Sequence, residues 1–506
     1  MACFYIENFG CRATQADGAA LEQQFRDKGF ERASSSDRAE IIILNTCTVT
    51  AEADKDARAS IRRHQRLNPQ SRILVTGCYA QRAPAELAEL PGVTWVVGNS
   101  HKHLAAEIAT SSLSGNPLFS GADGASNVPS TSGFVPLAEL SREYAPYVVV
   151  GDIFAHTELL AAPVFEAPNE RTRPNLKIQD GCNNRCSFCV IPYVRGQSRS
   201  LPMEHVLREI QTLVASGYRE VVISGINLGR WGRDLQVVGR RSLDVSEQNT
   251  ASLNSKLPVL KNPSFVDLIH AILEQTPLEK LRISSVEPMD WTDELINLVA
   301  SSERIAKHAH VPMQSGSDTV LRRMHRKYRP WHYREKILKI RNAMPTAAIG
   351  ADVMVGFPGE TEAEFLETRR MIEELPLTYL HVFTYSARPG TPASEHTGQV
   401  PAPVARERNR ILREIASSKK AVFMRSLVGS SVSAITLHSG EAEFTEALTD
   451  NYLKMKIYGC HSSNRWMNVK VMNPKVEALN GDTLLGTATD ADLGSDLGVH
   501  SDEQTH

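Results

Sequence analysis

The sequence predicts an α/β protein of three folded units: an open parallel α/β sheet, then a partial (β/α)6 barrel, then a small all-β barrel. Three observations support this order. The length of 506 residues corresponds to roughly three domains of about 150 residues each. Short apolar runs alternate with amphipathic stretches from residue 4 to about residue 385, a pattern typical of parallel α/β sheets. After residue 425 the apolar period becomes two, which indicates strands.

The amino-terminal unit, residues 1–110, contains the elements of an open sheet. Its apolar runs predict buried parallel strands at residues 3–7, 41–44 and 73–76. The amphipathic stretches between them predict helices at residues 16–28 and 51–67. The second helix should end where Asn68 precedes Pro69, because the residue before a proline disfavours helical geometry.

Residues 111–168 separate this unit from the next. Ser, Gly and Pro account for 14 of the 26 residues from Ser111 to Pro136. Such a composition lacks the apolar residues that a core requires. We therefore expect a flexible insertion or linker here.

The central unit, residues 169–424, repeats a strand followed by a helix six times. The strands are expected near Leu176 and at residues 220–224, 281–284, 306–311, 349–355 and 379–384. Six units are fewer than the eight of a closed barrel, so the barrel should be partial, with its functional face at the carboxyl ends of the strands. Residues 233–263 are polar and without pattern, and should form a surface insertion. A long helix, about residues 404–424, leads out of the barrel.

The carboxyl-terminal unit, residues 425–490, has alternating apolar residues with glycines between its stretches, which predicts a small all-β barrel. The tail, residues 491–506, is acidic and expected to be loose. Over the whole chain, 56 Lys and Arg oppose 58 Asp and Glu, which excludes a strongly basic protein. No apolar run approaches the roughly 18 residues of a membrane span. We expect no membrane contact and a cytoplasmic location.

Three of the eight cysteines, Cys182, Cys186 and Cys189, form one loop directly after the first barrel strand. Three thiolates at this spacing can hold a metal. A structural zinc site is the simpler alternative, but zinc takes four ligands and no fourth Cys or His follows nearby. A four-iron cluster held by three thiolates instead leaves one iron open to a small ligand.

Three further cysteines, Cys11, Cys47 and Cys78, each stand within a few residues of the end of a predicted strand. The carboxyl ends of parallel strands line one crevice, so residues distant in the sequence can meet there. The alternative is three buried structural cysteines. Their repetition at equivalent strand ends favours a second metal-binding group.

Other residues at barrel strand ends are small or polar, as ligand contacts often are. They are Gly225, Asn227, Ser285, Glu287, Gln314 and Gly356. Taken singly, a surface turn would explain Gly225, and a polar residue that caps the core would explain Gln314. Together they indicate a ligand-binding mouth of the barrel.

These motifs resemble those of the radical S-adenosylmethionine methylthiotransferase family. The resemblance rests on the Cys-x3-Cys-x2-Cys loop, on Phe188 before its last cysteine, and on residues 45–50, 76–81, 176–182 and 191–199. It implies that the loop cysteines hold a catalytic 4Fe-4S cluster whose open iron binds S-adenosylmethionine, which is then cleaved to a deoxyadenosyl radical.

The resemblance also implies two further groups of site residues. Cys11, Cys47 and Cys78 would hold a second 4Fe-4S cluster that supplies or carries sulfur. The six barrel-mouth residues would contact S-adenosylmethionine. In this family the radical removes hydrogen from carbon 2 of an adenine, and no side chain alone could activate such a bond.

Within the family, residues 47–50, 77–81, 315–320 and 449–454 are most similar to the bacterial branch that methylthiolates threonylcarbamoyladenosine beside the tRNA anticodon. Sister branches act on isopentenyladenosine or on an aspartate of a ribosomal protein. The resemblance implies a tRNA anticodon stem-loop as partner, an electron donor such as flavodoxin or ferredoxin, and a monomer. A rival hypothesis is a non-catalytic RNA-binding protein whose fold is stabilised by bound metal. It would not explain why the cysteine spacing leaves one iron of a cluster open to a ligand.

Basic residues near the fourth barrel strand predict phosphate contacts, since RNA binding requires clustered positive charge. They are Arg322, Arg323, Arg326 and Lys327. A solvated helix face is the alternative. The β unit resembles a TRAM domain, an RNA-binding module, yet residues 425–506 hold 6 Lys or Arg and 11 Asp or Glu, a net charge of 6 − 11 = −5. RNA contact there should depend on a local face that includes Lys454 and Trp466.

Overall fold

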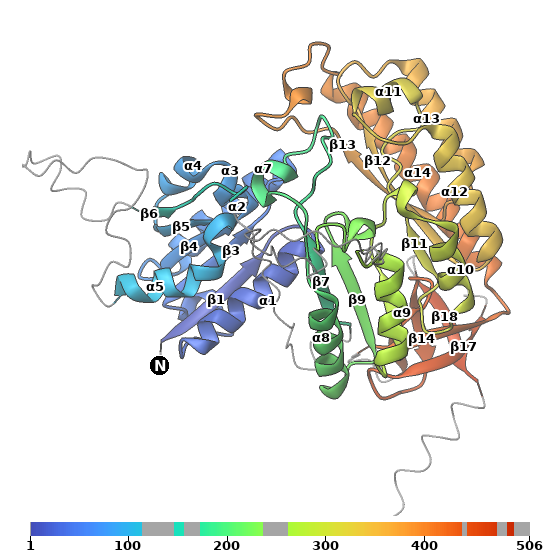
Figure 1. Cartoon of the computed structure of the whole chain (residues 1–506), viewed down its shortest axis with the longest axis horizontal. Coiled ribbons are helices and arrows are strands. Elements are labelled where there is room, and N and C mark those ends of the chain that lie inside the picture. The colour runs from blue at the N-terminus through green and yellow to red at the C-terminus, as the bar shows by residue number, and fades with distance from the viewer. Residues whose placement is uncertain are drawn as a thin grey trace, which may run out of the picture.

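The computed structural model describes residues 2–113, 146–155, 173–235, 262–437, 443–472 and 483–489. The tail expected at 491–506 lies outside the described residues, as do most of the expected insertions at 111–168 and 233–263. Three units follow one another along the chain, so the predicted fold class is confirmed (Figure 1). No helix in the described ranges is long and apolar enough to cross a membrane.

The amino-terminal unit is a six-stranded parallel sheet with strand order β2-β1-β3-β4-β5-β6. Its strands are β1 (Cys3–Asn8), β2 (Glu31–Arg32), β3 (Ile41–Thr46), β4 (Arg72–Gly77), β5 (Val93–Gly98) and β6 (Tyr147–Val149). One face packs on α1 (Arg12–Asp27) and α5 (Ala105–Leu113), and the other on α2 (Ala51–Leu67), α3 (Cys78–Arg82) and α4 (Pro84–Ala88). Every residue of β3 is buried, as its continuous apolar run predicts.

Two features of this sheet correct the expectation. Strand β6 lies inside the range 111–168 that was expected to be a linker, yet it pairs with Trp95 to Val97 of β5. Three residues are too few to show a periodic pattern, and their pairing partner is remote in the sequence. Helix α1 begins at Arg12 rather than at residue 16, because its first turn faces the central unit instead of solvent.

The central unit contains the six expected parallel strands and an antiparallel edge strand, β8 (Arg199–Ser200). The six are β7 (Asn175–Asp180), β9 (Glu220–Gly225), β10 (Lys280–Ile283), β11 (His308–His310), β12 (Ala348–Val355) and β13 (Tyr379–Thr384). Parallel bridges from Leu281 to Ile305 and from Ser285 to His310 join the β7 side to the β13 side. The arrangement is a partial barrel, open between β7 and β13.

Helices cover the outside of this barrel (Figure 1). They are α8 (Met203–Ala215), α9 (Phe265–Gln275), α10 (Asp293–Ser301), α11 (Asp318–Arg323), α12 (Pro330–Ala343), α13 (Glu362–Glu374) and α14 (Ala402–Ser426). Their apolar faces and the strands form one large core. The short helix α7 (Ile191–Arg195) stands apart from these, next to α3 of the amino-terminal unit.

The amino-terminal unit contacts both edges of the partial barrel. Helix α1 packs against β7 and β9. On the other side, beyond β13, the Arg388 guanidinium donates to Asp54 (2.7 Å) and to the Thr48 carbonyl (3.0 Å). The backbone N–H of Ala51 donates to the Ser386 hydroxyl (2.9 Å). The amino-terminal unit therefore spans the opening between β7 and β13.

The carboxyl-terminal unit is a closed five-stranded barrel, as expected for a TRAM-like domain. Its strands are β14 (Ser431–Thr436), β15 (Phe444–Thr449), β16 (Lys454–Tyr458), β17 (Trp466–Met472) and β18 (Leu484–Ala488). Arg282 of β10 donates to the carbonyls of Asp450 (3.0 Å) and Thr449 (3.3 Å). The Tyr452 ring lies 4.9 Å from His308, the first residue of β11. The loop between β15 and β16, which contains Asp450 and Tyr452, therefore closes the amino-terminal end of the partial barrel.

Candidate active site

The loop with Cys182, Cys186 and Cys189 lies at the carboxyl end of β7. Gly181 turns the chain there with φ +68°, and a Cβ at this position would lie 1.9 Å from the Gln197 carbonyl oxygen, so only glycine fits. The Cys182 N–H donates to the Gly196 carbonyl (3.1 Å). The three cysteines line a cavity of about 640 Å³ that also touches Phe154, in the segment after β6.

Burial disfavours free thiolates in this loop, but hydrogen-bond donors are in place for sulfur that is bound to a metal. Burial raises the pKa of Cys189 to about 12 and also raises that of Cys182, so a metal must displace protons here. Arg326 donates to the Cys186 sulfur (3.3 Å), and Asn227 to the Cys182 sulfur (3.8 Å). The Asn184 N–H also donates to the Cys182 sulfur (3.4 Å). Donors to sulfur stabilise thiolate ligands, so this loop fits an iron–sulfur cluster.

The structure brings Cys11, Cys47 and Cys78 together after β1, β3 and β4. Burial, with smaller contributions from the Cys78 and Cys11 thiols, raises the pKa of Cys47 to about 12. A Cβ on Gly10 would lie 2.6 Å from the Cys47 Cβ, so the turn before Cys11 touches Cys47 directly. This convergence fits a second cluster; which residues ligate it stays a prediction.

A small apolar cluster joins the two cysteine groups. Cys78 packs with residues of α7 and with the partly buried Cys182 and Cys189. The Asn99 amide donates to the Val194 carbonyl of α7 (2.7 Å) and to the Cys78 sulfur (3.5 Å). Both groups therefore adjoin the same apolar cluster at α7. In the described parts of the chain, no three Cys, His, Asp or Glu side chains are arranged to hold a single metal ion.

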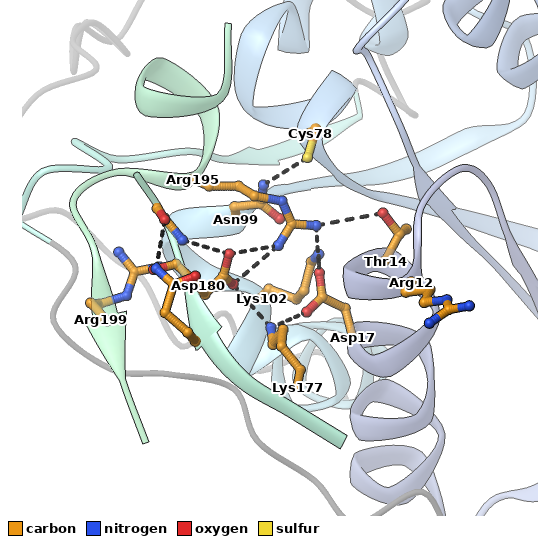
Figure 2. A network of polar contacts seen from close by, with 12 residues as sticks. Arg12, Thr14, Asp17, Cys78, Asn99, Lys102, Lys177, Asp180, Arg195 and Arg199 are labelled. Carbon is orange, nitrogen blue, oxygen red and sulfur yellow. Dashed lines mark hydrogen bonds and ion pairs between the residues drawn. The ribbon is translucent and has the colours of Figure 1, made fainter. Parts of the chain in front are cut away.

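A buried ionic network lies beside α7 and crosses between the two units. Figure 2 shows Asp17 of α1 facing Lys177 of β7 and Arg195 of α7. Asp17 accepts from Arg195 (2.9 Å), from Lys102 (2.9 Å) and from Lys177. Asp180 accepts two hydrogen bonds from Arg195 (3.0 Å each) and one from Lys177 (2.9 Å). None of the five is more than 7% exposed.

Charge in this network is nearly, but not fully, balanced. Burial alone would raise the pKa of Asp17, but Lys102, Lys177 and Arg195 outweigh it and hold that pKa below its usual range. Three cations and two anions leave one positive charge, and Arg195 acts electrostatically on Cys78 and Cys11. Sequence reasoning missed this network. The available signal was two charged residues, Lys177 and Asp180, inside a strand predicted to be buried.

Four of the residues expected to contact S-adenosylmethionine have polar partners at the barrel mouth. The Asn227 N–H donates to the Gln179 side chain (2.7 Å), and the Ser285 hydroxyl lies 2.7 Å from His310 Nδ1. Glu287 pairs with Arg326. Gln314 has a left-handed backbone (φ 61°) and bridges to Val353 of β12. Their roles as ligand contacts stay predictions.

The two glycines of that group have packing roles. A Cβ on Gly225 would lie 2.9 Å from the Gln179 side chain. Gly356 has φ +73°, and its Cβ would lie 2.7 Å from that of Ala405 in α14. The backbone N–H of Gly356 donates to Glu360 (2.7 Å). The turn after β12 therefore requires glycine, whether or not a ligand contacts it.

The basic residues at the end of α11 and directly after it do not form one surface. Arg322 is exposed and pairs with Asp318 (2.8 Å), and Lys327 is exposed. Arg323 is partly buried against Glu364 (2.8 Å). Arg326 is a correction, because it is 7% exposed and its guanidinium is engaged by Glu287 and the Cys186 sulfur. Arg326 thus serves the cysteine loop and is not available to an RNA phosphate.

The residues expected to bind RNA from the β unit differ in position. Lys454 is exposed at the start of β16. Trp466 lies at the junction with the barrel, where the Lys280 ammonium is 4.8 Å from the centre of its ring. That face of the indole is therefore covered by Lys280 and not open for base stacking.

Comparison with known proteins supports the same division of the chain. The radical SAM superfamily model matches residues 176–372, and the model described as uncharacterized protein family UPF0004 matches residues 3–98. The chain is 35% identical to threonylcarbamoyladenosine tRNA methylthiotransferase MtaB of Bacillus subtilis (strain 168), over 91% of each chain. It is 33% identical to the protein of the same name from Aquifex aeolicus (strain VF5), over 92% of this chain and 99% of that one.

Two further likenesses are more distant. The chain is 28% identical to tRNA-2-methylthio-N(6)-dimethylallyladenosine synthase of Moorella thermoacetica, over 85% of this chain and 86% of that one. Among solved structures, radical S-adenosylmethionine methyltransferase TsrM from Kitasatospora setae, with cobalamin and a 4Fe-4S cluster bound, matches with a TM-score of 0.50 and 16% identity. That match covers 78% of this chain and 74% of that chain, and it shows the fold alone.

Identity above 30% to relatives matched over nine-tenths of their length, two domain models in the expected order, and the cysteine loop at the end of β7 agree with one another. The chain therefore belongs to the radical S-adenosylmethionine methylthiotransferase family.

Proposed function

We propose that this protein converts threonylcarbamoyladenosine beside the tRNA anticodon to its 2-methylthio derivative. One observation supports this most strongly: two cysteine groups from different units adjoin the same apolar cluster at α7, at the barrel mouth. A reaction that joins sulfur to a carbon activated by a radical needs two such centres side by side. The relatives that are 31–35% identical are named for this activity.

The cofactors in this proposal are two 4Fe-4S clusters and S-adenosylmethionine. Cys182, Cys186 and Cys189 would hold one cluster beside the cavity of about 640 Å³. Together with a reduced cluster, bound S-adenosylmethionine supplies one-electron chemistry strong enough to take hydrogen from an aromatic carbon. Arg326 and Asn227 would stabilise the ligating sulfurs, and Asn99 would do so for Cys78.

The second cluster would be held by Cys11, Cys47 and Cys78. The positive charge left over in the ionic network faces these thiols through Arg195. Three thiolates on a 4Fe-4S core carry net negative charge, so the network and the cluster would neutralise each other.

The macromolecular partner in this proposal is the anticodon stem-loop of tRNA. Exposed Arg322, Lys327 and Lys454 are the candidates for phosphate contacts. An electron donor such as flavodoxin or ferredoxin would reduce the clusters, and the protein would act as a monomer in the cytoplasm, where tRNA is found.

The test separates the two cysteine groups. Cys47→Ala should remove about half of the iron and all methylthiolation, yet leave cleavage of S-adenosylmethionine to deoxyadenosine. Cys186→Ala should abolish cleavage. Cys460→Ala, at an exposed cysteine outside both groups, is the matched control and should change neither. Anaerobic assays with dithionite would follow deoxyadenosine and modified nucleosides in the same tube.

Two outcomes would overturn the proposal. Wild-type methylthiolation by Cys47→Ala would show that Cys11, Cys47 and Cys78 hold no cluster that the reaction needs. Mass spectrometry of tRNA nucleosides from a deletion strain would contradict the assigned substrate if 2-methylthio-threonylcarbamoyladenosine persisted and 2-methylthio-dimethylallyladenosine disappeared.

A further inference from the structure

The interior of the partial barrel is closed on two sides by other units. The amino-terminal unit spans its lateral opening, with α1 against β7 and β9 and with Thr48 and Asp54 bound to Arg388 beyond β13. The loop around Tyr452 closes its amino-terminal end. The remaining opening is the mouth, where both cysteine groups lie. A base presented to the mouth would therefore direct its substituent into this interior.

Polar side chains line this interior. His308 and His310 of β11, and Tyr379 and His381 of β13, form a continuous group of ring contacts, with His310 and His381 centroids 5.5 Å apart. Asp352 of β12 lies 3.4 Å from His310 Nε2.

The amino-terminal unit adds one cation to this group. Arg12, the first residue of α1, donates from its Nη2 to the Tyr452 hydroxyl (3.1 Å). Its charge also acts on His308, Tyr379 and His381. Arg12 thus faces the barrel interior although it directly follows Cys11.

The cations in this interior differ in how they are paired. Within the described residues, Arg12 forms no ion pair, and its only side-chain hydrogen bond goes to the neutral Tyr452 hydroxyl. Two neighbouring cations, Arg173 and Arg282, are instead paired with Glu220. The buried His310 Nε2 atom forms no hydrogen bond, and its nearest charged neighbour is Asp352 at 3.4 Å. His381 is exposed to solvent, so space remains beside it.

These contacts describe a site for an anionic group. A partly buried guanidinium without a counterion is costly unless a ligand neutralises it, and a planar fork of N–H donors suits a carboxylate. Asp352, His310 and His381 can pair with hydroxyl or N–H groups next to that carboxylate. An apolar ligand would desolvate Arg12 without compensation.

We propose that Arg12, together with His381, binds the carboxylate of the threonylcarbamoyl group and so selects this substrate over dimethylallyladenosine. This inference rests on the proposed function. In adenine, carbon 2 and the carbon that bears N6 both adjoin N1, so a base with carbon 2 at the cysteine groups has its N6 substituent close by. Arg12 directly follows Cys11 and faces that space.

The test uses binding to synthetic anticodon stem-loops under anaerobic conditions without reductant, so that no turnover occurs. One stem-loop carries threonylcarbamoyladenosine, a second its carboxamide, and a third dimethylallyladenosine. We expect wild-type protein to bind the carboxylate form at least about tenfold more tightly than the carboxamide, the size expected for one charge-assisted hydrogen bond. The RNA is otherwise the same, so phosphate contacts cancel in this ratio.

Variants of the protein show which residues cause the preference for the carboxylate form. Arg12→Met should reduce the ratio to about one, and Arg12→Lys should keep part of it. Arg26→Met, at the exposed end of the same helix, is the matched control and should keep all of it. His381→Leu should lower the ratio by a smaller factor. Iron content and deoxyadenosine formation, measured on each variant, show whether the neighbouring cysteine groups are intact.

The outcomes separate the two proposals. If wild type methylthiolates threonylcarbamoyladenosine but Arg12→Met and His381→Leu keep the wild-type binding ratio, the carboxylate site is wrong and the proposed function stands. If Arg12→Met loses iron, the binding ratio of His381→Leu alone tests the carboxylate site. If wild type methylthiolates only dimethylallyladenosine, the proposed function fails, and an equal affinity of wild type for carboxylate and carboxamide refutes the site.

Discussion

Replacing Asp17 by Asn should loosen the joint between the amino-terminal sheet and the barrel. Asp17 accepts from Lys102 and Arg195 at 2.9 Å and from Lys177, and it is 2% exposed. Removing one partner of a buried ion pair costs about 3–5 kcal/mol, because the remaining charges stay buried. In this network three cations would be left with Asp180 alone. At a urea m-value of about 3 kcal/mol/M, the unfolding midpoint should fall by about 1–2 M.

The matched control is Glu22→Gln on the same helix. Glu22 pairs with Arg26 (2.7 Å) and Arg32 (3.0 Å), whose side chains are 52% and 36% exposed. Such surface pairs contribute about 0–1 kcal/mol. Urea unfolding followed by circular dichroism gives the magnitude, and hydrogen exchange of peptides from α1 and β7 shows where protection is lost. Equal midpoints for the two variants would refute the idea that the network holds the units together.

Three further predictions test other parts of the molecule. His64, Ser60 and Arg63 outweigh burial and lower the pKa of Glu7 to about 2. The stabilisation from its carboxylate should therefore be present above pH 4.5 and lost as pH falls toward 2. Glu7→Gln should lower the free energy of unfolding by about 1–2 kcal/mol at pH 7 and by nothing near pH 2 in acid unfolding, and an unchanged loss near pH 2 would contradict this. Charge reversal of Arg322 and Lys327 should weaken tRNA binding and flatten its salt dependence by a slope of about one per lost contact, and an unchanged slope in filter binding would make them a solvated surface. Gly10→Ala, at φ +93° and against Cys47, should lower the iron content toward that of Cys47→Ala, and full iron retention would show that this turn can shift.

Local patterns in the sequence were enough to predict the elements and the cysteine groups. The strand at 41–44 and the helix at 51–67 are found where expected, because a continuous apolar run and a 3.6-residue period are set by neighbouring residues. The loop from Cys182 to Cys189 was visible for the same reason, since its three cysteines are close in sequence. The six barrel strands followed from repetition of one unit.

Features that depend on distant partners were not visible in the sequence. Lys177 lies 160 residues from Asp17, and Arg12 lies 440 residues from Tyr452. Strand β6 becomes a strand only because β5 offers its edge.

Arg326 looks like part of a basic surface run until its tertiary position beside Cys186 is known. The physical reason is that periodicity records which face of an element is buried, but not what it is buried against. The sequence therefore indicated Cys182, Cys186 and Cys189 by their spacing, and the other three cysteines by their positions at strand ends and by the family resemblance. The charges that join the units, and the cation that faces the barrel interior, were decided by how the three units pack together.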